Sequence, residues 1–227
     1  GTDLRRYADV RKESCRPDYR PAEEVNPMKV IIVTSPDIMS GEASLICRLL
    51  DAGADRVHLR KPHTPRQDYE RVIVQIPQEY RESVVVHDYF ELRDQYMLGG
   101  IHLNSRNSRP SSNIAGTVSR SCHSFAEVTK HKPNVDYLFL SPIFDSISKT
   151  GYLSAFSEED LYLASVNGII DNKVMALGGV TFESIPLLKR LSFGGAVMLG
   201  DVWNRIADGG INNVCSDIRE MKHYSCL

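Results

Sequence analysis

Basic and hydroxyl side chains follow short apolar runs of the chain at spacings suited to binding an anion. Arg60 ends the run 56–60, and its guanidinium offers five donors in a fixed fork that matches a phosphate or a carboxylate. The segment 141–151, after another run, adds three candidate ligands, namely Ser146, Ser148 and Lys149. We expect these side chains to bind an anionic substrate, with a charged surface turn as the structural alternative.

Glycine residues follow two later apolar runs. Gly178-Gly179 ends one run and Leu199-Gly200 ends the other, just before a predicted helix. Glycine lets backbone N–H groups approach a phosphate, and a helix N-terminus favours the negative charge. The two turns therefore predict a second phosphate-binding element, with tight packing of the turns as the alternative.

His123 is the candidate acid or base, because imidazole titrates near neutral pH. Ser124 and Glu127 have the spacing of a capping box, so Ser121 and His123 would lie beside a helix N-terminus. A partly exposed histidine at a helix start is the structural alternative. Cys122 could be a nucleophile in the same pocket, although a small buried residue is the commoner outcome.

Two further histidines, His58 and His87, are also predicted to lie in the pocket. Asp88 could hold a divalent cation, and it could equally cap the helix that follows. His58, His87 and His102 could together form the centre of a metal hydrolase. We consider this less favoured, because the barrel hydrolases use His-x-His on a strand and His58-Leu59-Arg60 lacks the second imidazole.

The elements that position these residues alternate between strand and helix. The predicted strands are 29–34, 56–60, 83–86, 100–103, 116–120, 136–140, 173–177 and 195–199. The predicted helices are 41–50, 65–76, 89–97, 124–131, 157–166, 181–191 and one within 201–221. Eight such repeats predict an α/β protein that folds as a single (β/α)8 TIM barrel, with its chemistry at the C-terminal ends of the strands. A doubly wound sheet is the alternative, but no glycine-rich turn follows the first strand.

Composition predicts one folded domain, 28–227, preceded by a different kind of segment. Residues 1–27 carry six basic and six acidic residues but few large apolar side chains, so we expect an extension or leader that is poorly ordered. A helix from Leu4 to Lys12 docked on the barrel is the weaker alternative.

Charge and cysteine content exclude several functional classes. The formal net charge of −2 offers no basic field for nucleic acid, and no apolar run reaches the roughly 20 residues of a membrane helix. The five cysteines form no CxxC pair, which argues against a disulfide scaffold and a zinc ribbon. We expect a cytoplasmic protein without nucleic-acid or membrane partners, and a homo-oligomer is compatible with the sequence.

Six motifs, taken in order, resemble those of the thiamine phosphate synthase superfamily. This superfamily contains thiamine-phosphate pyrophosphorylase, which is the synthase, and thiazole tautomerase. The motifs are Val57-His58-Leu59-Arg60, Val86-His87-Asp88, Gly100-Ile101-His102-Leu103, Ser121-Cys122-His123-Ser124, the segment from Pro142 to Lys149, and Ala176-Leu177-Gly178-Gly179. The resemblance extends from about Met28 to Arg205 and implies the same barrel fold and a role in thiamine biosynthesis.

The resemblance also implies roles for individual residues. In the synthase, hydroxymethylpyrimidine diphosphate loses pyrophosphate and the nitrogen of thiazole phosphate attacks the resulting cation. The implied diphosphate ligands are Arg60, Ser121, Ser148 and Lys149, with Ser146 alongside. The thiazole phosphate would be held by backbone N–H groups at Gly178, Gly179, Leu199 and Gly200. Asp88 would match one ligand of Mg²⁺.

The sequence departs from the synthase pattern in ways that favour the tautomerase. Pro62 replaces a lysine, His87 replaces an asparagine, and neutral Asn107 stands where the second acidic metal ligand is expected. Losing one such charge-stabilising group commonly costs about 10²- to 10³-fold in rate. Thiazole tautomerase needs a phosphate site and an acid or base, here His123, and no cofactor.

Our leading expectation is therefore a tautomerase-type enzyme that transfers a proton on a carboxylated thiazole phosphate. The first alternative is an Mg²⁺-dependent synthase in which Lys61, Arg106 or Arg109 replaces the missing groups. The second alternative is a non-catalytic pathway protein that binds a phosphorylated ligand. Which of the three applies decides whether a pyrimidine diphosphate is a second substrate.

Overall fold

Eight parallel strands in the described part of the chain close into a barrel in which β8 pairs with β1. The computed structural model describes residues 28–109, 115–145 and 154–223, so the predictions for residues 1–27 lie outside the described residues. The strands are β1 (Lys29–Val33), β2 (Arg56–Leu59), β3 (Val84–Val86), β4 (Gly100–Leu103), β5 (Thr117–Cys122), β6 (Tyr137–Leu140), β7 (Val174–Leu177) and β8 (Gly195–Met198). The predicted (β/α)8 barrel is confirmed.

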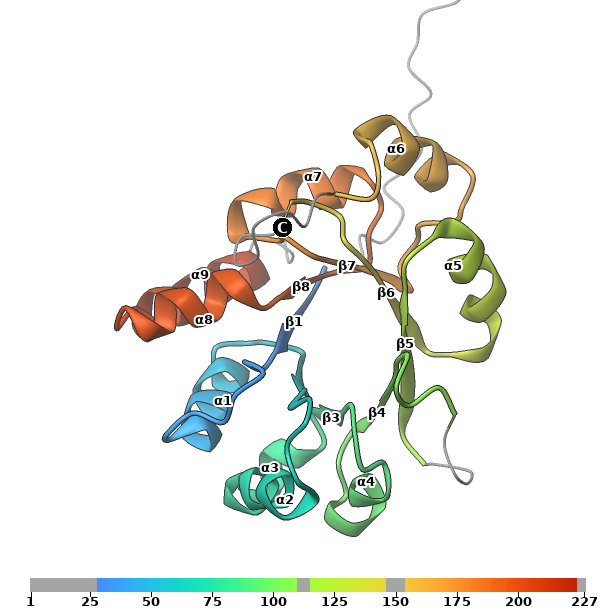
Figure 1. Ribbon diagram of the computed structural model, residues 1–227. Coiled ribbons are helices and arrows are strands. Elements are labelled where there is room, and N and C mark those ends of the chain that lie inside the picture. Colours follow the sequence, from blue (N-terminus) through green and yellow to red (C-terminus); the bar gives the residue numbers. More distant parts are fainter. Residues whose placement is uncertain (1–27, 110–114, 146–153, 224–227) are drawn as a thin grey trace, which may run out of the picture.

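Helices surround the barrel on its outside (Figure 1). They are α1 (Glu42–Asp51), α2 (Arg66–Gln75), α3 (Gln78–Arg81), α4 (Glu91–Tyr96), α5 (Phe125–His131), α6 (Glu158–Val166), α7 (Ile185–Arg190), α8 (Gly200–Ala207) and α9 (Ile211–His223), with the 3₁₀ helices η1 (Lys132–Asn134) and η2 (Phe182–Ser184). None of the helices in the described ranges is long and apolar enough to span a bilayer.

Two of the predicted helices differ from the structure. The region 201–221 holds two helices, because Gly209 adopts φ 82° and ends α8 before α9 begins. The helix predicted over 181–191 is divided into η2 and α7, since Pro186 has no N–H and fits only the first turn of α7. The short helix α3 was not predicted, and it buries no residue.

The interior of the barrel has an apolar side and a polar side. The apolar side comes from β1, β6, β7 and β8, and its residues are Ile31, Val33, Tyr137, Phe139, Met175 and Val197. The polar side comes from β2, β4 and β5, where His58, His102 and Ser119 are fully buried. A larger core fills the layer between the barrel and the helices.

The buried histidines are held in their neutral form. Desolvation lowers the pKa of His58 and of His87 well below the usual value, and the neighbouring imidazoles lower both further. Desolvation, followed by the positive charges of Arg120 and Arg60, lowers the pKa of His102 to about 3. The interior therefore contains imidazoles that stay uncharged at neutral pH.

A buried ion pair joins the end of β2 to the β1–α1 connection. Lys61 is 1 % exposed, and its ammonium group donates to the backbone oxygens of Ser35 (2.6 Å) and Asp37 (2.9 Å) and to the carboxylate of Glu42. Glu42 is itself 2 % exposed and also accepts from the backbone N–H of Met39. The pair therefore fixes the β1–α1 connection at the C-terminal ends of the strands.

We predict that Lys61→Met lowers the free energy of unfolding by about 3–5 kcal/mol, because the variant leaves the Glu42 carboxylate buried without its partner. The double variant Lys61→Met/Glu42→Leu should recover much of this loss, since neither charge remains. Urea denaturation measures both effects. The matched control, Arg71→Met, breaks an exposed pair with Asp68 and should cost less than about 1 kcal/mol. Equal losses in Lys61→Met and Arg71→Met would contradict the assignment.

We also predict that the fold loses stability as the pH falls below about 6.5, where the unfolded state protonates its histidines while the barrel keeps His58, His87 and His102 neutral. Each histidine then removes up to about 1.4 kcal/mol per pH unit, until the pH reaches its folded pKa. Urea denaturation from pH 8 to pH 4 measures the slope. His102→Gln should reduce it by about one proton, and exposed His63→Asn should leave it unchanged. A slope that His102→Gln does not change would refute this explanation.

Candidate active site

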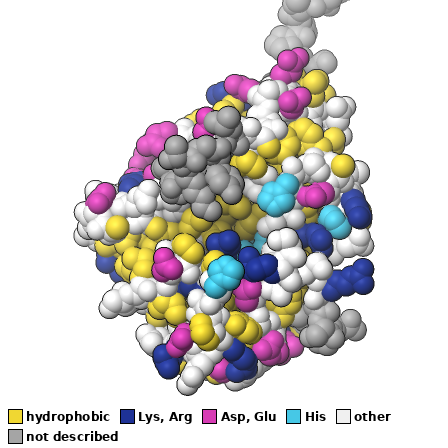
Figure 2. All heavy atoms as spheres, viewed as in Figure 1, with side chains coloured by type: hydrophobic (Ala, Val, Ile, Leu, Met, Phe, Trp, Pro, Cys, Tyr) yellow, Lys and Arg dark blue, Asp and Glu magenta, His cyan; other side chains and the backbone are white. Residues whose placement is uncertain are grey.

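A cavity of about 370 Å³ opens at the C-terminal ends of the barrel strands. Basic and histidine side chains gather around this hollow, and hydrophobic side chains line its interior (Figure 2). Its volume falls within the usual range for sites of small molecules. The strand ends are where a (β/α)8 barrel carries its chemistry, so this cavity is the candidate active site.

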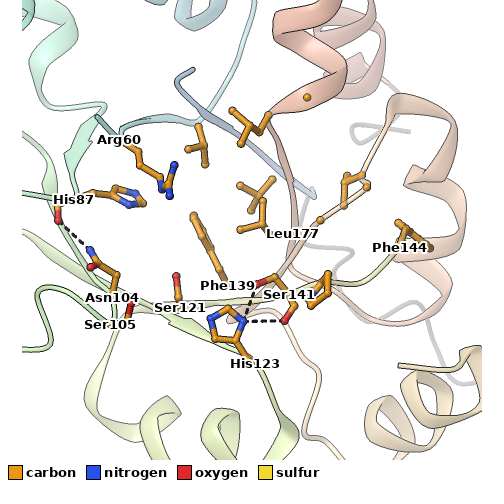
Figure 3. Close-up of a pocket in the computed structure, with 18 of the residues that line it drawn as sticks. Arg60, His87, Asn104, Ser105, Ser121, His123, Phe139, Ser141, Phe144 and Leu177 are labelled. Carbon is orange, nitrogen blue, oxygen red and sulfur yellow. Dashed lines mark hydrogen bonds between the residues drawn. The ribbon is translucent and has the colours of Figure 1, made fainter. Parts of the chain in front are cut away.

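Two arginines make one side of the cavity basic. Arg60 follows β2, Arg106 lies in the connection after β4, and both line the cavity. Arg60 and His87 point into the space (Figure 3). The backbone N–H of Arg60 donates to the hydroxyl of Thr34 at 3.0 Å, which fixes the chain where the guanidinium leaves it. Burial lowers the pKa of Arg60, and the positive charge of Arg106 lowers it further. A bound anion would relieve that repulsion.

Glycines form the wall that faces the arginines. Gly178 and Gly179 follow β7 with φ 97° and 63°, and a Cβ on Gly179 would lie 2.2 Å from the carbonyl oxygen of Asp145. Both residues line the cavity together with Leu199 and Gly200, where α8 begins. Steric exclusion explains why residues 178 and 179 are glycines, and all four residues bring their backbone to the cavity. This wall suits a phosphate group.

His123 stands on the rim, just after β5, and its side chain lines the cavity. The ring nitrogen Nδ1 lies 3.1 Å from the carbonyl oxygen of Ser141, which can only accept, so Nδ1 carries the hydrogen (Figure 3). Neutral His123 therefore keeps a lone pair on Nε2. Ser124 caps α5 as predicted, because its side chain accepts from the backbone N–H of Glu127. The carboxylate of Glu127 accepts from the backbone N–H of His123 (2.6 Å), one residue before the N–H that a capping box uses.

Two predicted pocket residues lie elsewhere. Side chains on β5 alternate, so Ser121 lines the cavity while Cys122 points into the outer core. Burial raises the pKa of the Cys122 thiol to about 11, which leaves no thiolate for nucleophilic attack at neutral pH. His58 is fully buried inside the barrel and does not line the cavity. The predicted ligands Ser146, Ser148 and Lys149 lie outside the described residues.

Of the three basic residues proposed to replace missing groups, Arg106 reaches the cavity. Lys61 lies beyond the end of β2 and turns away into its ion pair with Glu42. Arg109 is exposed and does not line the cavity. Consecutive residues at the end of a strand point in opposite directions, as Arg60 and Lys61 do here, and Glu42 is the buried partner of Lys61.

The residues implied for Mg²⁺ do not fit that ion. Both carboxylate oxygens of Asp88 lie 3.3 Å from the guanidinium of Arg106, and one also accepts from the amide nitrogen of Asn107 at 2.8 Å. The same nitrogen donates to the backbone oxygen of His87, so Asn107 turns its donor side toward Asp88. Mg²⁺ requires oxygen ligands, and here a cation already neutralises the carboxylate. Asp88 does not cap α4 either, since Phe90 holds that position.

The three histidines of the proposed metal hydrolase form a hydrogen-bonded cluster instead. His58 Nδ1 lies 3.0 Å from His87 Nε2, and His58 Nε2 lies 2.8 Å from the hydroxyl of Tyr137. Both ring nitrogens of His102 lie 2.8 Å from serine hydroxyls. The rings of His87 and His102 stack with centroids 4.2 Å apart, and one ion cannot lie in the planes of two stacked rings. We therefore assign no metal to this cluster.

Sequence reasoning missed the apolar part of the cavity and the residue that shapes its rim. Phe139 and Leu177 line the cavity from β6 and β7 (Figure 3). Every second residue of a strand faces the barrel interior, and this alternation could have identified both residues. Asn104 donates to the backbone oxygens of His87 and His102 and accepts from the backbone N–H of Arg106. No local pattern signals such a bridging amide.

The chain matches the family model described as thiamine monophosphate synthase over residues 30–201. It is 24% identical over 166 residues to a thiamine-phosphate synthase of Bacteroides thetaiotaomicron, covering 67% of this chain and 79% of the relative. The thiamine-phosphate synthase of Phocaeicola vulgatus is 23% identical with the same coverage.

Two solved structures resemble the fold. A thiamine phosphate pyrophosphorylase from B. thetaiotaomicron shares 40% identity with a TM-score of 0.75, covering 86% of this chain and 96% of that one. A thiamine phosphate pyrophosphorylase from Pyrococcus furiosus has a TM-score of 0.70 at 17% identity, over 89% and 99% of the two chains, and supports the fold alone. Since the family model spans more than half of the chain, the protein belongs to the thiamine monophosphate synthase family.

Proposed function

We propose that this protein is a thiamine-phosphate synthase that joins hydroxymethylpyrimidine diphosphate to thiazole phosphate and releases pyrophosphate. The observation that carries the proposal is that Arg60 and Arg106 converge on one side of a cavity whose opposite wall is built from glycines. Two anion-binding surfaces across one cavity suit a reaction with a diphosphate and a monophosphate. The relatives named above support the synthase over the tautomerase that the sequence led us to expect.

The reaction requires charge neutralisation on the leaving group. The C–O bond between the pyrimidine methylene and the diphosphate breaks, and its electron pair leaves with pyrophosphate. The thiazole nitrogen then uses its lone pair to form the new C–N bond. A negative charge develops on the leaving oxygen of the diphosphate. We assign the stabilisation of this charge to Arg60 and Arg106, because preorganised cations lower the energy of the transition state. The described residues suggest no ligand set for Mg²⁺, so no step is assigned to it.

The remaining groups orient the two substrates. The glycine wall with the N-terminus of α8 would hold the thiazole phosphate through backbone N–H groups. Phe139, Leu177 and Val197 give the rings an apolar surface between the two anion sites. By the resemblance, Ser148 and Lys149 would add to the diphosphate site from the segment outside the described residues. In this proposal the reacting carbon and nitrogen lie between the two anion sites.

We predict that Arg60→Ala lowers the rate of thiamine phosphate formation about 10²- to 10³-fold, because it removes a cation from the leaving diphosphate. Arg106→Ala should also slow the reaction, but less, since its side chain is 37 % exposed. The assay combines both substrates and measures thiamine phosphate and pyrophosphate. Arg190→Ala, an exposed residue at the end of α7, is the matched control and should keep the wild-type rate. Failure of the wild-type protein to form any product would refute the synthase function.

Tautomerase activity remains a second candidate, and the placement of His123 favours it. Among the described residues none bonds to its Nε2, which can take a proton, while Nδ1 is held by the carbonyl of Ser141. Isomerisation of a carboxylated thiazole phosphate needs one group that removes and returns a proton, without a diphosphate. The glycine wall would hold its phosphate as in the synthase.

For this second candidate we predict that the wild-type protein isomerises the carboxylated thiazole phosphate, and that His123→Ala reduces the rate about 10²- to 10⁴-fold. NMR spectroscopy of the two tautomers in a timed reaction measures this rate. Exposed His63→Asn is the control and should isomerise at the wild-type rate. A wild-type protein that forms thiamine phosphate but leaves the tautomer unchanged would eliminate the candidate.

A further inference from the structure

The carboxylate of Asp88 receives all of its bonds from N–H groups of the connection after β4. Nη2 of Arg106 lies 3.3 Å from both carboxylate oxygens, and the side-chain amide of Asn107 donates to one of them at 2.8 Å. The Asp88 side chain is 15 % exposed, so little water competes for these bonds. A metal ion ligated by Asp88 would lie beside the guanidinium, and two cations so close repel each other strongly away from bulk water.

The backbone oxygen next to this carboxylate has no lone pair left for a metal ion. The carbonyl oxygen of His87 accepts from the side-chain amides of Asn104 (3.0 Å, Figure 3) and Asn107 (3.1 Å). A carbonyl oxygen has two lone pairs and can only accept. The nitrogen of each amide, rather than its oxygen, therefore faces this point. The orientation of Asn107 follows from this bond and is not a free choice between its two ends.

The connection after β4 is folded so that Arg106 stays in this place. The side-chain oxygen of Asn104 accepts from the backbone N–H of Arg106 (3.0 Å) and of Asn107 (3.1 Å). The backbone N–H of Asn104 donates to the backbone oxygen of Asn107 at 3.0 Å, which closes the turn. Asn104 is itself bonded to the backbone oxygens that end β3 and β4. The guanidinium is thus carried by a turn attached to the barrel.

Arg106 keeps donors for a ligand while it bonds to Asp88. A guanidinium has five N–H groups in a fixed plane, and Asp88 is bonded through Nη2. No residue in the described ranges accepts from Nε or Nη1, and Arg106 lines the cavity together with Arg60. One edge of the guanidinium can therefore hold the carboxylate while another donates to an anion. A metal ion that bridges a carboxylate and a phosphate does the same work.

We propose that the guanidinium of Arg106 takes the place of a divalent cation between Asp88 and a bound diphosphate, so that this protein binds the anion without Mg²⁺. The positive charge is then built into the chain and does not depend on the concentration of a metal. This role of Arg106 rests on the proposed function for its ligand, the diphosphate. It adds that Mg²⁺, which complexes diphosphate in solution, competes with the protein for the free anion.

Calorimetry with inorganic pyrophosphate tests this role on the wild-type protein. Binding should be at least as tight in EDTA as in excess Mg²⁺. Arg106→Ala should weaken binding in EDTA about tenfold to a hundredfold, which is the size of a hydrogen bond to a charged group. The exposed control Arg190→Ala should bind as the wild type does. Binding that is more than about tenfold tighter in Mg²⁺ than in EDTA would overturn the inference.

A second measurement follows the metal directly and needs no substrate. Mn²⁺ prefers the same oxygen ligands as Mg²⁺ and is detected by EPR spectroscopy. Arg106→Ala/Asn107→Asp removes the guanidinium and adds a carboxylate beside Asp88, so this variant should bind Mn²⁺ more tightly than the wild type. The matched control Arg71→Ala frees the exposed carboxylate of Asp68 and should bind Mn²⁺ no more tightly than the wild type.

Two results of the Mn²⁺ measurement would contradict the role of Arg106. The first is Mn²⁺ binding by the wild type that Asp88→Asn abolishes, because the guanidinium would then not exclude a metal. The second is a double variant that binds Mn²⁺ no better than the wild type does.

The outcomes separate this inference from the proposed function. Pyrophosphate binding in EDTA without any formation of thiamine phosphate would uphold the inference and count against the synthase. Formation of thiamine phosphate in Mg²⁺ and none in EDTA would uphold the synthase and overturn the inference. A protein that binds no pyrophosphate in either buffer would also overturn the inference, while the product assay decides on the synthase.

Discussion

Closure of the parallel barrel imposes the constraint on which the rest of the structure depends. Each strand must alternate its side chains between the barrel interior and the helix layer. This alternation puts His102, Ser119 and Ser121 on the inside and sends Cys122 to the outer core. Polar groups on the inside must bond to one another, because few other partners reach them. The histidine cluster is the consequence, and it connects the interior to the floor of the cavity.

Charge in this protein acts locally rather than through the whole molecule. The net charge of −2 conceals two arginines that share one cavity, and residues 1–27 contribute equal numbers of basic and acidic groups. Arg106 also neutralises Asp88, so a guanidinium occupies the neighbourhood of the carboxylate where a metal would otherwise supply positive charge. An arginine keeps its proton under these conditions, so the charges of Arg60 and Arg106 themselves do not titrate.

The sequence predicted the barrel well because each strand is a short apolar run, and such runs carry the signal of burial on both faces. It also indicated Arg60, Ser121, His123 and the glycines, which all line the cavity, since they stand at strand ends. It could not reveal contacts between residues far apart in the chain. The pairing of Lys61 with Glu42, and of Asp88 with Arg106, depends on where two connections meet in space. The division of the last helices required the φ angle of Gly209, which composition alone does not give.

The preference between the two enzyme activities changed because the relatives are named as synthases, and the position of Arg106 removes one objection from the sequence. From the sequence, the loss of a lysine and of an acidic metal ligand counted against a leaving diphosphate. The structure shows that Arg106, which no strand motif predicts, enters the cavity from the connection after β4. A cation can be supplied by any loop that reaches the same volume, so the missing lysine on the strand does not by itself exclude the proposed synthase. What a site can stabilise is decided by the charges that converge on it, whichever element carries them.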